Sequence, residues 1–486
     1  MGERKISLKK NIVLNYIKTL SGLIFPLITF PYFSRILKPE GLGTYNFAVS
    51  ITSYFTLIAG LGIYSYAIKQ GASVRDNKDE LSKLVSEMFS INLISTGVSF
   101  VLFIGSIFII PKFFDYRIIL LVCAIPFVTG SFGMEYLFNA VEDFTYITLR
   151  SIIMQTITVV FLFIFVRSPD DIILYSLINS GSVLFQNILN FFSAKKYVKI
   201  NIFQKLELTK HLKPIFILFA LNIASSVYSI LDTSMLGFIS GEVEVGYYSA
   251  ATKINRMVLS VVASMSSVFL PRLAYLTKNG QKDEYKNMIN KSFELIILIA
   301  FPCTVGLFMV SEPIIMLLSG QEYVSAIPVM KIMNPIVLIV GLSSVTGTQV
   351  LFTQGKEKRV LYSVIAGAVL NFILNLILIP KINSMGAAIA SVCAEICVTS
   401  LQFIFGAKYF YASKVILNLI KYGLMSLVMA VAVYFAMIKF ENDAIKCLAG
   451  ISTGVVSYLI CLLVTKNKFL FDILGKFKKN KAVQND

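Results

Sequence analysis

The sequence predicts an all-α integral membrane protein with about fourteen transmembrane helices in two pseudo-symmetric lobes around a central cavity. Of its 486 residues, 56% are hydrophobic and only 15% are charged, which is more apolar than a soluble core requires. Apolar runs of the roughly 20 residues that span a bilayer recur along the whole chain. The chain also repeats itself, and in repeat-built transporters the substrate path usually runs between the two halves.

The repeat consists of short matching segments at a nearly constant offset. Residues 43–48 read GTYNFA and residues 246–251 read GYYSAA, while the string KDE occurs at 78–80 and again at 282–284. We therefore expect an N-terminal lobe over residues 1–207, with six helices and an inner loop. The C-terminal lobe is expected over residues 208–486, with the remaining helices and a basic C-terminal tail.

The expected helices follow one another with short connections. In the first half they begin near residues 11, 43, 84, 118, 146, 172 and 215, and in the second near residues 246, 293, 326, 360, 385, 415 and 445. Prolines are expected to interrupt two of them, at Pro26 and Pro31 in the first and at Pro328 and Pro335 in the tenth. No connection is long enough for a soluble domain.

Basic residues set the expected orientation, because cytoplasmic loops carry an excess of Lys and Arg. With the N-terminus inside, 31 of the 44 basic residues fall in cytoplasmic segments, 8 in outer loops and the other five within apolar runs. Both termini are therefore expected to be cytoplasmic. The net charge of +17 then reflects topology and anionic membrane lipids, and no nucleic acid is expected as a partner. The only histidine, His211, is expected to be solvated in a basic inner loop.

Charged side chains inside the apolar runs need a partner, a water-filled cavity or a route to the interface, because burying each costs roughly 2.5–3.5 kcal/mol on insertion scales. Lys253 and Arg256 lie one turn apart on one helix face, where two cations repel unless an anion lies beside them. Asp232 lies at a matching depth on the preceding helix, so an Asp232–Lys253 ion pair is one interpretation. Lys18 is equally compatible with snorkelling and with lining a cavity.

Oxygen-bearing side chains at one depth offer a second interpretation of Asp232. Asn371 and Asn375 share a face of one helix, and Ser391 and Glu395 lie one turn apart on the next. Carboxylate, amide and hydroxyl oxygens from three helices can hold a hard cation such as Na⁺. Interhelical hydrogen bonding explains the Asn and Ser residues equally well. A proton carried by Glu395 or Asp232 is the alternative to sodium.

Three strings resemble the polysaccharide repeat-unit flippases of the Wzx type, within the multidrug, oligosaccharidyl-lipid and polysaccharide exporter superfamily. They are PLITFPYFSRILKPEGLGTYNFA at 26–48, AGLGIYSYAIKQGASVRDNKDELSKLVSEMF at 59–89 and LDTSMLGFISGEVEVGYYSAATKINR at 231–256. The resemblance covers essentially the whole chain. It implies two lobes that form a V around a central cavity, the cytoplasmic membrane of a bacterium, and a short oligosaccharide on undecaprenyl pyrophosphate as substrate. A polysaccharide polymerase and assembly proteins are then candidate partners.

The resemblance also implies site residues. In related lipid II flippases a sodium site uses positions that correspond here to Asp232, Asn371, Asn375 and Ser391. The pattern has an acid at the position where this chain has the amide Asn375. The cationic cavity of the family implies Lys or Arg residues that face the pyrophosphate. The available candidates are Lys18, Arg35, Arg150, Lys253 and Arg256. An interfacial anchor is the alternative for Arg35, and a residue of a cytoplasmic loop is the alternative for Arg150.

The leading hypothesis is a flippase for lipid-linked oligosaccharide, driven by an ion gradient through alternating access. A multidrug or small-molecule cation antiporter on the same fold is the first alternative, which acids in the first-lobe cavity would favour, but only Glu87 and Glu135 are available there. A membrane polysaccharide polymerase fits poorly, because sugar-nucleotide chemistry needs acidic residues on sizeable loops. We expect no enzyme, no catalytic residue, and no cofactor other than a coupling Na⁺ or H⁺.

Overall fold

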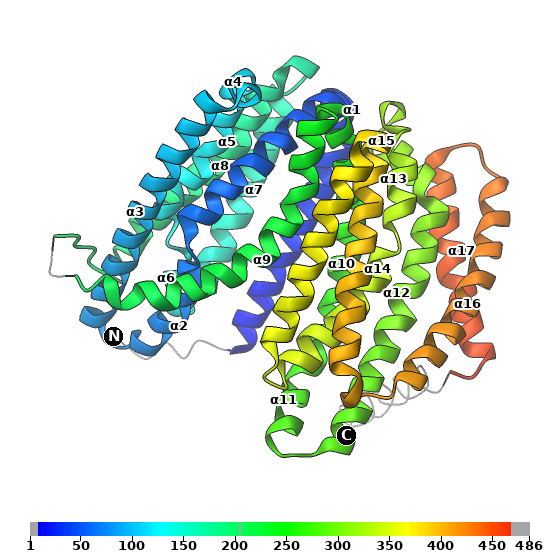
Figure 1. Cartoon of the computed structure of the whole chain (residues 1–486). Helices are drawn as coiled ribbons and strands as arrows, with labels where there is room; N and C mark the ends of the chain where they lie inside the picture. Colours follow the sequence, from blue (N-terminus) through cyan, green and yellow to red (C-terminus); the bar gives the residue numbers. More distant parts are fainter. Residues whose placement is uncertain (1–7, 204–205, 468–486) are drawn as a thin grey trace, which may run out of the picture. The chain divides into compact units, whose positions relative to one another are not determined.

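A computed structural model describes residues 8–203 and 206–467, and within those ranges every regular element is a helix (Figure 1). Most of the expected basic C-terminal tail lies outside the described residues. The helices of the first half are α1 (Leu8–Gly60), α2 (Ile63–Val74), α3 (Lys78–Ile109), α4 (Pro111–Asp115), α5 (Arg117–Gly133), α6 (Glu135–Ala140), α7 (Phe144–Phe165), α8 (Ile172–Ala194) and α9 (Thr209–Ile239).

The second half follows the same pattern of long apolar helices. Its elements are α10 (Glu242–Ser266), α11 (Leu270–Lys278), α12 (Lys282–Leu318), α13 (Ala326–Met333), α14 (Ile336–Ser343), the π-helix η4 (Ser344–Phe352), α15 (Glu357–Gly406), α16 (Ala412–Ile438) and α17 (Asp443–Val464). Outward-facing apolar side chains are strongly exposed, for example Phe108 at 74% and Leu448 at 70%, as expected of helices that face lipid.

The helices agree with the expected number of about fourteen spans. Among the described residues, ten helical segments are long and apolar enough to cross a membrane, and the shorter apolar helices Arg117–Gly133 and Ile230–Ile239 add to them. Two long helices each contain two of the expected runs. Helix α1 has non-helical backbone at Lys38 (φ 58°, ψ 178°), and α15 has it at Ile382 and Asn383. The expected multi-pass membrane fold is therefore confirmed.

Proline positions predicted the helix breaks only in part. Helix α1 continues through Pro26 and Pro31, so the interruption expected there is wrong. Its break at Lys38 comes directly before Pro39, whose ring disfavours the helical conformation of the preceding residue. In the tenth expected helix, Pro335 does separate α13 from α14. Its other proline lies in the first turn of α13, where a missing N–H costs no hydrogen bond.

Contact density divides the chain into two compact units. The first contains Met1–Ser249 and Phe372–Ala387, and the second contains Ala250–Asn371 and Ala388–Asp486. The transport lobes expected at 1–207 and 208–486 stay a prediction. In the first unit, an apolar core forms where α2, α3 and α6 meet the start of α9, with Met88, Phe138 and Ile215 fully buried.

The second unit is organised around α12, which packs against both α16 and α17. The hydroxyl of the fully buried Tyr422 on α16 donates to Glu294 on α12 at 3.0 Å, and Tyr458 on α17 donates to the carbonyl of Leu298 at 2.9 Å. A third polar contact fixes η4, where Gln349 donates to the carbonyl of Ser266 at 2.7 Å. These bonds satisfy polar groups that lie inside apolar helices.

The two glycines that open the sequence repeat pack backbone against backbone within the first unit. A Cβ atom on Gly43 would lie 1.7 Å from the carbonyl oxygen of Glu242, and a Cβ on Gly246 would lie 2.1 Å from that of Pro39. Gly43 thus faces the residue four positions before Gly246, and Gly246 faces the residue four positions before Gly43. This reciprocal contact, which we call the glycine crossing, requires residues without a side chain and shows that the two copies of the repeated segment meet.

Candidate functional site

Two of the five predicted cations meet at one carboxylate in the first unit. Lys18 Nζ on α1 donates to Glu135 Oε1, and Arg150 Nη2 on α7 lies 3.5 Å from Glu135 Oε2. The side chains of Lys18 and Glu135 are each 31% exposed, and that of Arg150 is 5% exposed. These three residues, which we call the charge cluster, are therefore accessible from the carboxylate side and closed on the guanidinium side.

Arg150 is held in place by neighbours on α7 and α8. Its Nη1 donates to Oδ1 of Asn190, and its Nη2 donates to Ser151 Oγ at 3.3 Å. Asn190 in turn donates to the carbonyl of Gly133, the last residue of α5. The alternative that Arg150 belongs to a cytoplasmic loop is wrong, because Arg150 lies within α7, which begins at Phe144, and its side chain is buried.

Glu135 begins the short helix α6 after a sharp change of chain direction. Met134, between α5 and α6, has a left-handed backbone (φ 42°), which is uncommon outside glycine and marks a position fixed by its surroundings. Asn139 donates to the carbonyl of Glu135 at 2.8 Å and to the hydroxyl of Tyr64 at 3.1 Å. The backbone that carries the carboxylate is thus anchored, while the carboxylate itself faces the two cations.

The other three predicted cations lie elsewhere. Arg35 is exposed on α1. Lys253, half-buried, and Arg256, exposed, lie on α10 and belong to the second unit. That any of these three candidates faces a cavity stays a prediction.

Asp232 on α9 is the centre of a second polar group in the first unit. The hydroxyl of Tyr248 donates to its Oδ2 at 2.6 Å, and Nδ2 of Asn375 donates to its Oδ1 at 2.6 Å. All three residues are buried. The structure therefore brings together two of the four predicted sodium ligands. Tyr248 was not predicted, and its only signal in the sequence is its place beside the repeat glycine Gly246.

The remaining predicted ion ligands lie on α15 in the second unit. Asn371 and Ser391 are buried and Glu395 is half-buried. The four-residue sodium site and the Asp232–Lys253 ion pair both stay predictions. In this arrangement Asn375 and Tyr248 present an N–H and an O–H to the carboxylate of Asp232, and a cation at Asp232 stays a prediction.

His211 is buried, and the expectation that it is solvated is wrong. Its Nδ1 lies 2.8 Å from the hydroxyl of Tyr66 on α2, and its Nε2 lies 2.8 Å from Oε2 of Glu87 on α3. Glu87 also accepts from the backbone N–H of Glu207 at 3.0 Å and lies 3.6 Å from Lys210 Nζ. The ring is buried because the first turn of α9 packs against α2 and joins this network.

Exposed charges surround that network. Glu207 accepts from Lys83 at 2.8 Å and from Lys210 at 3.2 Å. These two ammonium groups lower the pKa of Glu207 to about 2, so its carboxylate stays charged at physiological pH.

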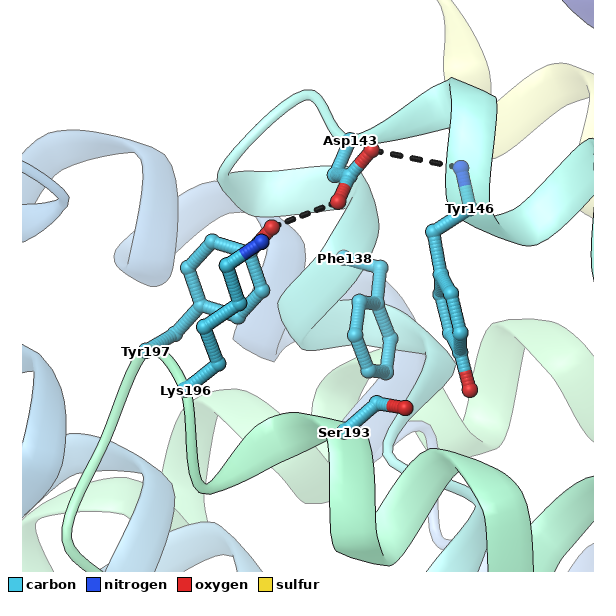
Figure 2. Close-up of a pocket in the computed structure, with 6 residues that line it drawn as sticks. All are labelled: Phe138, Asp143, Tyr146, Ser193, Lys196 and Tyr197. Carbon is cyan, nitrogen blue, oxygen red and sulfur yellow. Dashed lines mark hydrogen bonds between the residues drawn. The ribbon is translucent and has the colours of Figure 1, made fainter.

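A small pocket in the first unit has a structural role (Figure 2). It measures about 170 Å³, below the roughly 300–1,000 Å³ of typical ligand pockets, and is lined by Phe138, Asp143, Tyr146, Ser193, Lys196 and Tyr197. Asp143 accepts from the backbone N–H of Tyr146 at 3.2 Å and from the hydroxyl of Tyr197 at 2.5 Å. Its carboxylate therefore caps α7 and ties it to the end of α8.

Comparison with known families identifies the chain. Residues 8–277, more than half of its length, match the family model described as polysaccharide biosynthesis protein. The chain belongs to the polysaccharide biosynthesis protein family. A second model, MatE, matches residues 218–377. The resemblance seen in the sequence is confirmed.

Relatives of this chain cover most of its length. It is 26% identical over 412 residues to the putative O-antigen transporter of Escherichia coli (strain K12), which covers 83% of this chain and 98% of the relative. It is 24% identical over 389 residues to the capsular polysaccharide biosynthesis protein CapF of Staphylococcus aureus. This match covers 78% of this chain and 92% of the relative.

Solved structures share its fold. The lipid II flippase MurJ in an inward closed conformation superposes with a TM-score of 0.77 at 18% identity, covering 94% of this chain and all of that one. An inward-facing multidrug resistance MATE family transporter of the MOP superfamily gives a TM-score of 0.61 at 18% identity. The superposition covers 82% of this chain and 97% of that transporter. This chain therefore has the fold of MurJ and of the MATE family transporters.

In this fold the charge cluster is suited to hold an anion. Lys18 Nζ and Arg150 Nη2 both direct positive charge to the place that the Glu135 carboxylate occupies, and an oxygen of a phosphate or diphosphate can be paired there in the same way. Such a group binds through hydrogen bonds and charge, without any covalent step.

Proposed function

We propose that this protein is a flippase that moves oligosaccharide repeat units, linked to undecaprenyl pyrophosphate, across the cytoplasmic membrane of a bacterium for surface or capsular polysaccharide assembly. The observation that carries the proposal is the charge cluster, in which Lys18 and Arg150 converge on one partly exposed carboxylate. The fold shared with a lipid II flippase and the relatives named O-antigen transporter and capsular polysaccharide biosynthesis protein support it.

The chemistry of such a substrate explains why a cationic site suffices. Sugars and pyrophosphate do not cross hydrocarbon unaided, whereas the polyprenyl chain can stay in lipid while the headgroup passes through the protein. No bond is made or broken, so the role is transport and not catalysis. A polysaccharide polymerase and assembly proteins are the partners we propose for the outer face, where the repeat unit would be joined to the growing chain.

We further propose that transport is coupled to Na⁺ or H⁺ bound at Asp232. An ion can bias a transporter toward one conformation only by its difference in affinity between the two states. A buried carboxylate with an amide and a phenol beside it supplies a site where such a difference can arise. This proposal includes Asn371, Ser391 and Glu395 as further ligands of the ion.

A cation antiporter on the same fold is the second candidate, favoured by the MatE match over residues 218–377. Such a transporter needs an unneutralised acid in its first-lobe cavity. In this protein Glu135 faces two cations and Glu87 is held by His211 and Lys210. The charges of the first unit therefore favour an anionic substrate.

Loss of the two cations tests the proposed function. We expect the double variant Lys18→Gln/Arg150→Gln to lower export of surface polysaccharide at least about tenfold, because two charge-assisted contacts to the diphosphate are lost. Export is measured by surface staining in a strain that lacks the chromosomal gene, with the membrane level of each variant quantified. Arg75→Gln, which breaks an exposed pair with Glu142, is the matched control. Wild-type export by the double variant would contradict the proposal.

Cysteine labelling tests the proposed orientation. In a variant without the six native cysteines, single cysteines near Glu242 and Lys381 are expected to react with an impermeant maleimide added to intact cells. Cysteines near Lys199 and Lys356 are expected to react only after the membrane is opened, because basic loops stay in the cytoplasm. Labelling of both sets in intact cells would overturn the proposed topology.

A further inference from the structure

We propose that Glu135 is an internal substitute for the substrate's diphosphate: it neutralises Lys18 and Arg150 in the empty protein and is displaced when the substrate binds. This inference rests on the proposed function, since it assigns the anion that the charge cluster receives.

The contacts of Glu135 make it the displaceable member of the cluster. In the part of the chain that the structure describes, its carboxylate contacts Lys18 and Arg150 and has no other hydrogen-bond or ion-pair partner. Its side chain is 31% exposed, so it can turn toward solvent. Arg150, by contrast, is closed off by Asn190 and Ser151. Arg150 is therefore fixed in place, and the carboxylate of Glu135 can leave.

Glu87, the other acid considered for the first-lobe cavity, shows what a fixed carboxylate looks like in this protein. It is 1% exposed and accepts from the backbone N–H of Glu207 at 3.0 Å, with His211 Nε2 at 2.8 Å. Releasing it would leave buried donors without an acceptor. Among the described residues, no backbone N–H donates to the carboxylate of Glu135.

Glu135 is also an incomplete partner for Arg150. The 3.5 Å separation between Arg150 Nη2 and Glu135 Oε2 exceeds the roughly 2.7–2.9 Å of a charge-assisted hydrogen bond. The Nε of Arg150 is buried and has no hydrogen-bond partner among the described residues. A guanidinium has five N–H donors, so a diphosphate, with more oxygens than a carboxylate, can occupy donors that Glu135 leaves unused.

The substitute has a function in the empty protein. A transporter that has released its anionic substrate must return with its binding cations, and unpaired cations in an apolar surrounding are costly. With Glu135 in place, Lys18 and Arg150 stay paired during that step. Removal of the carboxylate is therefore expected to strengthen substrate binding and at the same time slow the return.

The test separates affinity from turnover. Farnesyl diphosphate serves as the probe for the purified full-length protein in nanodiscs. We expect Glu135→Gln to bind it about tenfold more tightly than the wild type, because the probe no longer competes with two partly exposed ion pairs. In the export assay the same variant should be slower. The control Glu142→Gln, which breaks the exposed pair with Arg75, should change neither quantity.

Each outcome is decisive. Equal or weaker binding by Glu135→Gln, with binding by the wild type intact, would overturn the inference and leave the proposed function standing. If no variant binds the probe, both fail. Should Glu135→Gln not accumulate, Glu135→Asp keeps the charge but shortens the side chain, and it should bind the probe more tightly than the wild type. A value at or below wild-type affinity for Glu135→Asp would also overturn the inference.

Discussion

Replacing either glycine of the crossing with alanine should reduce export at least about tenfold. We expect an effect of this size because the added methyl group must separate two buried backbone segments that are in contact. A Cβ on Gly43 would lie 1.7 Å from the carbonyl oxygen of Glu242, and a Cβ on Gly246 would lie 2.1 Å from that of Pro39. Both obstructing atoms are backbone, so no side-chain rotation can make room. Export and thermal unfolding of the purified protein measure the effect.

The chain supplies matched controls for this experiment. Gly97 and Gly105 lie inside α3, where an added Cβ meets nothing within 4 Å. Alanine at either position is expected to leave export unchanged and to stabilise the helix by up to about 1 kcal/mol, because glycine is a poor helix former. Wild-type export by both Gly43→Ala and Gly246→Ala would show that the close approach is not needed for function.

Polar contacts near the crossing explain why it cannot simply widen. The hydroxyl of Tyr116 donates to Glu242 at 2.7 Å, and Lys112 donates to the carbonyl of Gly237. On the other side, the backbone N–H of Ser384 donates to Glu244 at 3.1 Å. A shift of α10 large enough to admit a methyl group would strain its bonds to Tyr116 and Ser384 together.

The fold could be predicted from the sequence because it depends on local quantities. The length of an apolar run decides whether a helix can span the membrane, and the breaks at Lys38 and at Ile382–Asn383 fall between the expected runs. Depth along a helix is also local. Asp232 and Asn375 were matched by depth as well as by the family resemblance, and they hydrogen-bond at 2.6 Å.

The buried charges could not be predicted, because their partners lie far away in the chain. Glu135 is separated from Lys18 by 117 residues, and His211 from Glu87 by 124. Nothing local to Arg150 or His211 indicates whether tertiary packing will cover them. A polar side chain near a helix end favours solvent on average, and here Asn190 and Glu87 supply the buried partners that reverse this preference.

The exchange of Asp232 for asparagine is expected to remove the dependence of export on an ion gradient. In the wild type the carboxylate is buried and accepts from Tyr248 and Asn375, each at 2.6 Å. A negative charge in that place is costly without a cation to neutralise it. Asparagine keeps the shape and an acceptor oxygen but removes the charge that attracts Na⁺ or H⁺.

Export from energised vesicles, with sodium and proton gradients imposed separately, measures this coupling. We expect Asp232→Asn to lower the stimulated rate roughly tenfold, within the usual range of coupling between two sites. Asn375→Ala should weaken the response less, because the charge remains. Tyr248→Phe is the matched control for lost hydrogen bonding, since it removes one donor to Asp232 and leaves the ion's counter-charge intact. Stimulation by sodium assigns Na⁺ as the coupling ion, and stimulation by the proton gradient alone assigns H⁺.

Equal wild-type rates with and without either gradient would exclude ion coupling at Asp232. The supply of substrate at the inner face would then be what drives transport.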